Sequence, residues 1–109
     1  MELSRNLQIS TAAIDSTGMC LFIAFPILDQ PETFQALLDL MNGFLGTNMT
    51  SEDVVALGKN ILQNEKDFNL RAGFVSSHDR LPGFFINEAL SPHNTTFSVS
   101  EKDLDEVLN

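Results

Sequence analysis

The residues of this chain best suited to chemistry lie in one short stretch, Asp15-Ser-Thr-Gly18-Met-Cys20. On a regular helix, positions five apart lie about 140° apart around the axis, so Asp15 and Cys20 would not face one site. Gly18 permits a positive φ and a sharp turn, which would let the carboxylate and the thiol face the same site. A helix that begins near Cys20 would favour the thiolate, the form of cysteine that binds metal.

A second interpretation of this stretch is structural. Asp15 would cap a helix, and Cys20 would be a small, buried apolar side chain. The spacing alone favours this interpretation, because the chain contains one cysteine. A single cysteine also excludes an internal disulfide, and it excludes any cluster or zinc site built from several thiolates of this chain.

Two weakly defined segments flank the motif. Residues 1–10 have little pattern and predict a strand or an irregular entry segment, after which Ser10 or Thr11 would cap a short helical turn. Residues 19–25 are apolar almost all round, which predicts a buried helix. Pro26 is expected to end or kink that helix.

Two longer helices follow. The first is expected to begin near Pro31, because apolar residues then recur at helical spacing, and Gly43 and Gly46 are expected to mark its end. The second is expected to begin at Thr50, where Asp53 completes a capping box, and to end before Gly73.

The remaining elements complete an all-α, multihelical fold of about four helices. Gly58 costs its helix about 1 kcal/mol relative to alanine, which indicates close packing against another helix. Residues 74–99 predict a long irregular segment, and such segments are usually functional or wrap another surface. Ser100 and Asp103 resemble a second capping box that opens a last helix.

The composition is that of one small acidic domain. The chain has 109 residues, of which 43% are hydrophobic and 19% charged, and its net charge is −9. This acidity argues against nucleic acid and against an anionic membrane surface as partners. No apolar run reaches the length of about 18–20 residues that a membrane span needs, and no signal-peptide pattern opens the chain. The cytoplasm is therefore the expected compartment.

Other polar residues carry weaker signals. His78 and Asp79 could act as a base and the group that orients it, but neighbouring loop residues seldom point that way, so a solvated loop is favoured. His93 is expected to be a surface histidine. The acidic residues near the C-terminus lack the glycine and the spacing of a calcium loop, and a solvated helix face is favoured for them.

The sequence around the motif resembles a known family. Residues 15–22 are similar to the second pterin-binding motif of tungsten-containing aldehyde ferredoxin oxidoreductases, D-x-x-G-L-C followed by an apolar helix. Residues 50–74 resemble that family's helix ending in F-N-x-R-x-G-F, and residues 79–82 resemble its D-x-L-P segment. The similarity covers roughly residues 12–86, and residues 103–108 resemble the family's next helix.

The resemblance implies a role for each motif residue. Asp15 would hydrogen-bond a pterin of the tungsten- or molybdenum-pterin cofactor, and Gly18 and Met19 would belong to the same pterin motif. Cys20 would be the fourth ligand of a [4Fe–4S] cluster and would lie between the cluster and the pterin. The parent enzyme would oxidise aldehydes to carboxylic acids and pass electrons through the pterin and the cluster to ferredoxin. Met19 stands where the family usually has leucine, a small change in size and polarity.

The resemblance also implies that residues 1–109 are one piece of the C-terminal helical domain of a larger enzyme. The family's other three cluster cysteines, its other D-x-x-G motif and its candidate proton-transfer residues are absent from this sequence. The isolated chain is therefore expected to bind no cofactor and to be catalytically inert. Its partners would be the N-terminal domains of the same enzyme, and it would self-associate or expose apolar groups near the motif, including Phe22 and Phe25. The alternative is a non-enzymatic, acidic helical interaction module in which Cys20 is structural.

Overall fold

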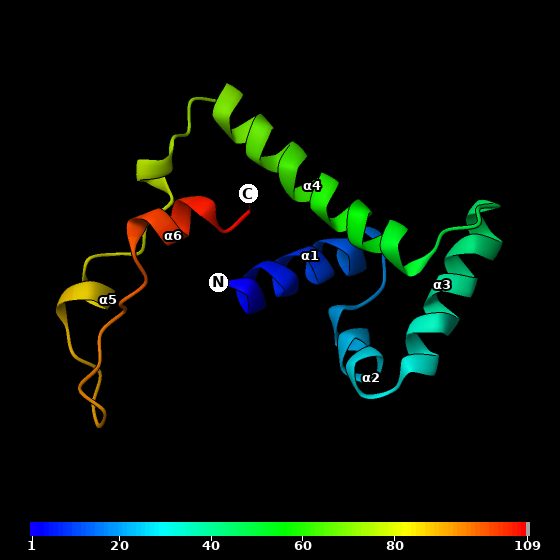
Figure 1. Cartoon of the computed structure of the whole chain (residues 1–109), viewed down its shortest axis with the longest axis horizontal. Coiled ribbons are helices and arrows are strands. Elements are labelled where there is room, and N and C mark those ends of the chain that lie inside the picture. Colours follow the sequence, from blue (N-terminus) through cyan, green and yellow to red (C-terminus); the bar gives the residue numbers. More distant parts are fainter. Residues whose placement is uncertain (109) are drawn as a thin grey trace.

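The computed structural model describes residues 1–108, and the fold over that range belongs to the all-α class, as predicted. The described part contains no β-strand, only an isolated bridge between Leu90 and Thr95. The α-helices are α1 (Glu2–Ser16), α2 (Ala24–Asp29), α3 (Pro31–Leu45), α4 (Ser51–Arg71), α5 (Phe84–Asn87) and α6 (Glu101–Glu106), with 3-10 turns η1 (Leu21–Ile23) and η2 (Ser76–His78). In Figure 1, α1 and α4 occupy the middle, with α2 and α3 on one side and α5 and α6 on the other.

Helix α1 corrects the expectation for the N-terminal residues. The segment predicted as a strand or an irregular entry is helical from Glu2, and Ser10 and Thr11 lie inside the helix rather than at its cap. Its buried residues, Ile9, Ala13 and Ile14, recur at helical spacing but are few. Packing against α4 supplies the stability that the weak local pattern does not.

The α1–α4 contact confirms the predicted role of Gly58. Gly58 is buried, and a Cβ built on it would overlap the backbone carbonyl oxygen of Ile9. It would also lie 3.0 Å from Cγ2 of Ile9. Only a residue without a side chain therefore allows the two helices to approach this closely.

The ends of α3 and α4 agree with the sequence. Pro31 is the first residue of α3, and Gly46 ends the helix with φ 68°. At the start of α4, Asp53 N–H donates to the Thr50 hydroxyl (3.3 Å) and the Asp53 carboxylate accepts from Thr50 N–H (2.7 Å), which completes the predicted capping box. Gly73 follows α4 with φ 93°.

The segment after the motif differs from its prediction. Residues 19 and 20 are not helical, and the chain turns through η1 into α2. Pro26 neither ends nor interrupts α2, because it lies in the first turn, where a missing N–H costs no hydrogen bond. The segment is also not buried: Phe22 is 74% exposed and Phe25 62% exposed.

The C-terminal third is largely irregular, as predicted. Its last helix, α6, is capped locally and is joined by two contacts to the segment after η2 and to α1. Ser100 accepts a hydrogen bond from Asp103 N–H (3.1 Å) and caps α6, which ends at Glu106. The Arg80 guanidinium pairs with Asp105 at 2.8 Å. At the other end of α6, Nε of Arg5 donates to the Val107 carbonyl at 2.6 Å, which connects α6 to α1.

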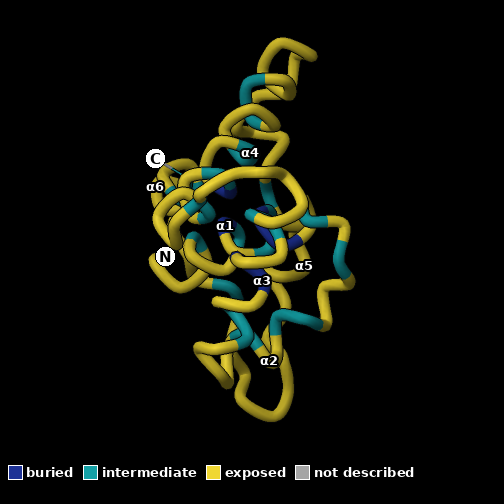
Figure 2. The backbone as a smooth tube through the Cα atoms, turned by 90° about the vertical axis from the view of Figure 1, so that its right-hand side faces the viewer, coloured by how far each residue is buried: buried dark blue, intermediate teal, exposed yellow. Residues whose placement is uncertain are grey.

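The molecule is much more extended than a compact domain of this size. Its radius of gyration is 17.4 Å, against about 13 Å for a compact chain of this length. Its accessible surface is 8298 Å², against about 6,000 Å² for a compact protein of this mass. Figure 2 shows a backbone that is mostly exposed, with few buried positions. Within residues 1–108, the buried apolar residues are Ile9, Ala13, Ile14, Leu37 and Leu38.

Candidate cofactor-binding turn

The motif forms the turn that leaves α1. Asp15 lies in the last turn of the helix, and Thr17 follows its end. Gly18 has φ 73°, so the sharp turn predicted at this glycine is present. Cys20 then stands directly before η1 in an extended conformation.

Hydrogen bonds from Thr17 hold this turn together. The Ile14 carbonyl accepts from both Thr17 N–H (3.0 Å) and the Thr17 hydroxyl (2.7 Å). The same hydroxyl oxygen accepts from Met19 N–H at 3.2 Å. Sequence reasoning missed this role of Thr17. The signal that points to it is a threonine beside a glycine at a helix end, where hydroxyls commonly bond to nearby backbone groups.

The exposure of the motif residues argues against the structural interpretation. Asp15 does not cap a helix, since it lies near the C-terminal end of α1. Cys20 is a free, exposed cysteine and not a buried apolar side chain. Gly18 is also exposed, and a Cβ built on it would meet no atom within 4 Å, so a ligand has room to approach its backbone.

The described residues do not form a complete metal site by themselves. Within residues 1–108, no group of three or more His, Cys, Asp or Glu side chains is placed to hold a metal ion. A [4Fe–4S] cluster is held by about four thiolates. Cys20 therefore fits such a cluster as a single ligand, and the other ligands would have to come from another part of the protein.

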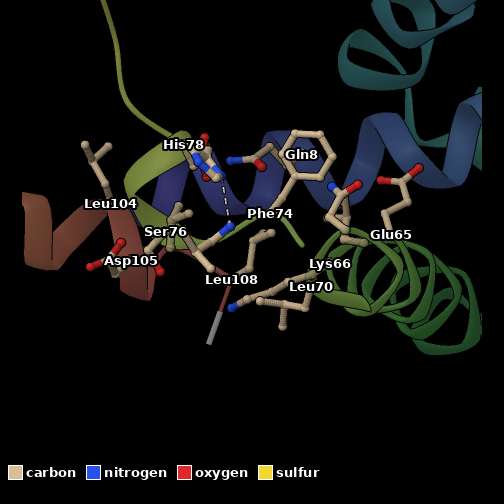
Figure 3. A pocket seen from close by; sticks show the side chains of 15 residues that line it. Gln8, Glu65, Lys66, Leu70, Phe74, Ser76, His78, Leu104, Asp105 and Leu108 are labelled. Atoms are coloured by element: carbon tan, nitrogen blue, oxygen red, sulfur yellow. Dashed lines mark hydrogen bonds between the residues drawn. The ribbon is translucent and has the colours of Figure 1, made fainter. Parts of the chain in front are cut away.

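A cleft elsewhere in the molecule contains none of the motif residues. It has a volume of 440 Å³ and lies between α1, the end of α4 and α6 (Figure 3). His78 lies at its edge, where Nδ1 accepts a hydrogen bond from Val75 N–H at 3.2 Å and the ring meets Phe74 edge-on at 5.8 Å. His78 is thus engaged with its own loop, consistent with the favoured interpretation of this segment.

In the described part of the chain, the pKa is shifted for two side chains, and both lie outside the motif. Hydrogen bonds from the backbone and hydroxyl of Thr50 lower the pKa of the Asp53 carboxyl. The hydrogen bond to Asp105 raises the pKa of the Arg80 guanidinium. Each shift follows from a contact that caps or connects helices, so neither identifies a catalytic group.

Comparison with known proteins decides the family. A family model described as "Aldehyde ferredoxin oxidoreductase, domains 2 & 3" matches residues 1–109. The chain belongs to the aldehyde ferredoxin oxidoreductase family. The resemblance noted in the sequence is thereby confirmed at the level of the family.

Curated relatives of this family chain carry the name "Tungsten-containing aldehyde ferredoxin oxidoreductase". The protein from Pyrococcus furiosus is 38% identical over 84 residues, which are 76% of this chain and 13% of the relative. The proteins from Pyrococcus horikoshii and Thermococcus kodakarensis are each 33% identical over the same shares of the two chains. No solved structure matches significantly.

The aligned part of this chain thus spans about an eighth of the length of the curated relatives it matches. In the part of the chain that the structure describes, no helix is both long and apolar enough to cross a membrane. The roles assigned to Asp15, Gly18, Met19 and Cys20 are tested by none of these comparisons and stay predictions.

Proposed function

We propose that this chain is a piece of the C-terminal helical domain of an enzyme that oxidises aldehydes to carboxylic acids with ferredoxin as electron acceptor. In that enzyme it would form one side of the cofactor site. The observation that carries the proposal is the surface turn between α1 and η1, where Gly18 has a positive φ and Cys20 presents a free thiol. The family match supports it over the whole chain.

Each motif residue has a physical task in this proposal. The exposed Asp15 carboxylate would accept hydrogen bonds from N–H groups of a pterin. Gly18 and the Met19 backbone would allow that pterin to approach closely, because no Cβ projects from the turn at Gly18. Cys20, as a thiolate, would be the fourth ligand of a [4Fe–4S] cluster. When bound, the metal-pterin group supplies two-electron oxidation and the cluster supplies one-electron transfer.

The partner that completes the site would be the remainder of the same enzyme. Apolar side chains beside the motif are mostly uncovered: Phe22 and Phe25 stack at 5.9 Å and are both exposed. Phe44 on α3 is 87% exposed. Exposed apolar surface of this kind marks an interaction site. The extended shape and the share of the relatives that the chain covers both support a fold completed by further domains.

The isolated chain would bind no cofactor and would be catalytically inert, because it offers one thiolate where a cluster needs about four. Iron, sulfide and tungsten would be measured in the purified 109-residue chain after anaerobic incubation with iron and sulfide. We expect only trace amounts of each. Stoichiometric metal would contradict this part of the proposal.

A chimera tests the function directly. Residues 1–109 would replace the matching segment of the Pyrococcus furiosus relative, and iron content and aldehyde-dependent reduction of ferredoxin would be measured. We expect both in the chimera, with iron lost or converted to a smaller cluster in Cys20→Ser. Asn60→Ser, at an exposed position of α4, is the matched control and should change neither. A folded chimera in which Cys20→Ser keeps all iron would overturn the assignment of Cys20 and favour the interaction-module alternative.

A further inference from the structure

One threonine connects the end of α1 to the backbone that carries Cys20. The Thr17 hydroxyl donates to the Ile14 carbonyl at 2.7 Å and accepts from Met19 N–H at 3.2 Å. Ile14 belongs to the buried core and is only 8% exposed. The hydroxyl therefore joins a fixed point of the core to the residue immediately before Cys20.

The rest of the turn has little else to hold it. Gly18 is exposed and its Cβ position is open, so no packing restrains it. The Gly18 N–H donates to the Asp15 carbonyl at 3.2 Å, and the next peptide N–H, that of Met19, is held by the Thr17 hydroxyl. On the other side, Ile23 N–H bonds to the Cys20 carbonyl at 3.0 Å and holds η1, not the turn.

We infer that Thr17 is a positioning residue, whose hydroxyl sets the placement of the Cys20 thiol relative to the Asp15 carboxylate. The inference rests on the proposed function in one respect: the placement matters for function because the two side chains would face one cofactor site. A glycine turn samples many conformations unless a side chain restrains it, and a ligand held in one orientation costs less entropy to bind. Thr17 supplies this restraint within the chain, before any cofactor is present.

The test uses three variants of the 109-residue chain. Thr17→Val keeps the shape of the side chain but removes the two hydrogen bonds of the hydroxyl, those with the Ile14 carbonyl and Met19 N–H. Thr17→Ser keeps the hydroxyl and should behave like the wild type. Thr11→Val is the matched control, because Thr11 lies on the same helix and its hydroxyl makes no hydrogen bond among the described residues. Helical circular dichroism establishes that each variant is folded.

Two measurements report on the turn. In Thr17→Val, the Met19 amide should exchange with solvent about fivefold faster, the loss expected for one hydrogen bond. A nitroxide attached to Cys20, the one cysteine of the chain, should become more mobile by electron paramagnetic resonance. Thr17→Ser and Thr11→Val should match the wild type in both.

Wild-type exchange and label mobility in a folded Thr17→Val would overturn the inference, as would a Thr17→Ser variant that behaves like Thr17→Val. If Thr17→Val does not fold, the wild-type chain alone decides, because an unprotected Met19 amide would exclude the hydrogen bond. These results do not depend on cofactor. Retention of all iron by Cys20→Ser in the chimera would defeat the proposed function and leave the positioning result standing.

Discussion

At the scale of single residues, the room around a glycine decides the effect of replacing it more than its intrinsic helix propensity does. Gly58 and Gly43 both lie inside long helices, where glycine is unfavourable by about 1 kcal/mol relative to alanine. Their surroundings differ completely. A Cβ at Gly58 would overlap the Ile9 carbonyl of α1, whereas a Cβ at Gly43 would meet no atom within 4 Å. The same substitution should therefore have opposite effects at the two positions.

Gly58→Ala should destabilise the chain by about 1–2 kcal/mol, because the forced separation of α1 from α4 outweighs the gain in helix propensity. Gly43→Ala is the matched control and should stabilise it by about 0.5–1 kcal/mol. Urea unfolding followed by circular dichroism measures both. Stabilisation by Gly58→Ala would show that the two helices do not approach as closely as described.

At the scale of helices and turns, capping sets where helices begin and end. The Thr50–Asp53 box opens α4, the longest helix. Since Thr50 lowers the pKa of Asp53 below the ordinary value of 3.8, the ionised carboxylate stabilises the folded state. This contribution is complete above the ordinary pKa and is lost as the pH falls through the lowered value.

Asp53→Asn should therefore remove part of the loss of stability that occurs at the start of α4 as the pH falls below the ordinary pKa of 3.8. Exchange of the Val54 amide, which donates to the Thr50 carbonyl at 3.2 Å, reports on this turn. Glu52→Gln is the control, because it removes a first-turn charge that makes no capping hydrogen bond. An identical acid response in wild type and Asp53→Asn would contradict the capping role.

At the scale of the whole molecule, the chain buries too little to be a compact domain. Among the described residues only five apolar side chains are buried. Phe22 and Phe25, beside the motif, and Phe44, on α3, are mostly exposed. Hydrophobic surface of this extent is stable in water only when something covers it. In the proposed enzyme, that cover would be the remaining domains.

Without those domains, the isolated chain should self-associate. Light scattering at increasing concentration should show oligomers for the wild type, and the double variant Phe22→Ser, Phe25→Ser should reduce association without loss of helical signal. Phe68→Ser, which removes a similarly exposed phenylalanine from α4, should have a smaller effect. A wild-type chain that stays monomeric throughout would count against an apolar interface beside Cys20.

The sequence by itself determined the features that depend on neighbouring residues. The helical class, the start of α3 at Pro31, the Thr50–Asp53 box and the turn at Gly18 all follow from local geometry and hydrogen bonding, which a few adjacent residues specify. The motif from Asp15 to Cys20 was visible for the same reason, and its surroundings indicated the family that the comparison confirmed.

Only the tertiary structure decided what depends on distant residues. Residues 2–10 are helical because Ile9 and its neighbours pack on α4, where Ile9 meets Gly58, a residue far along the chain. The segment after Cys20 is exposed rather than buried. Apolar composition indicates that a segment favours burial, but it does not indicate which surface covers it.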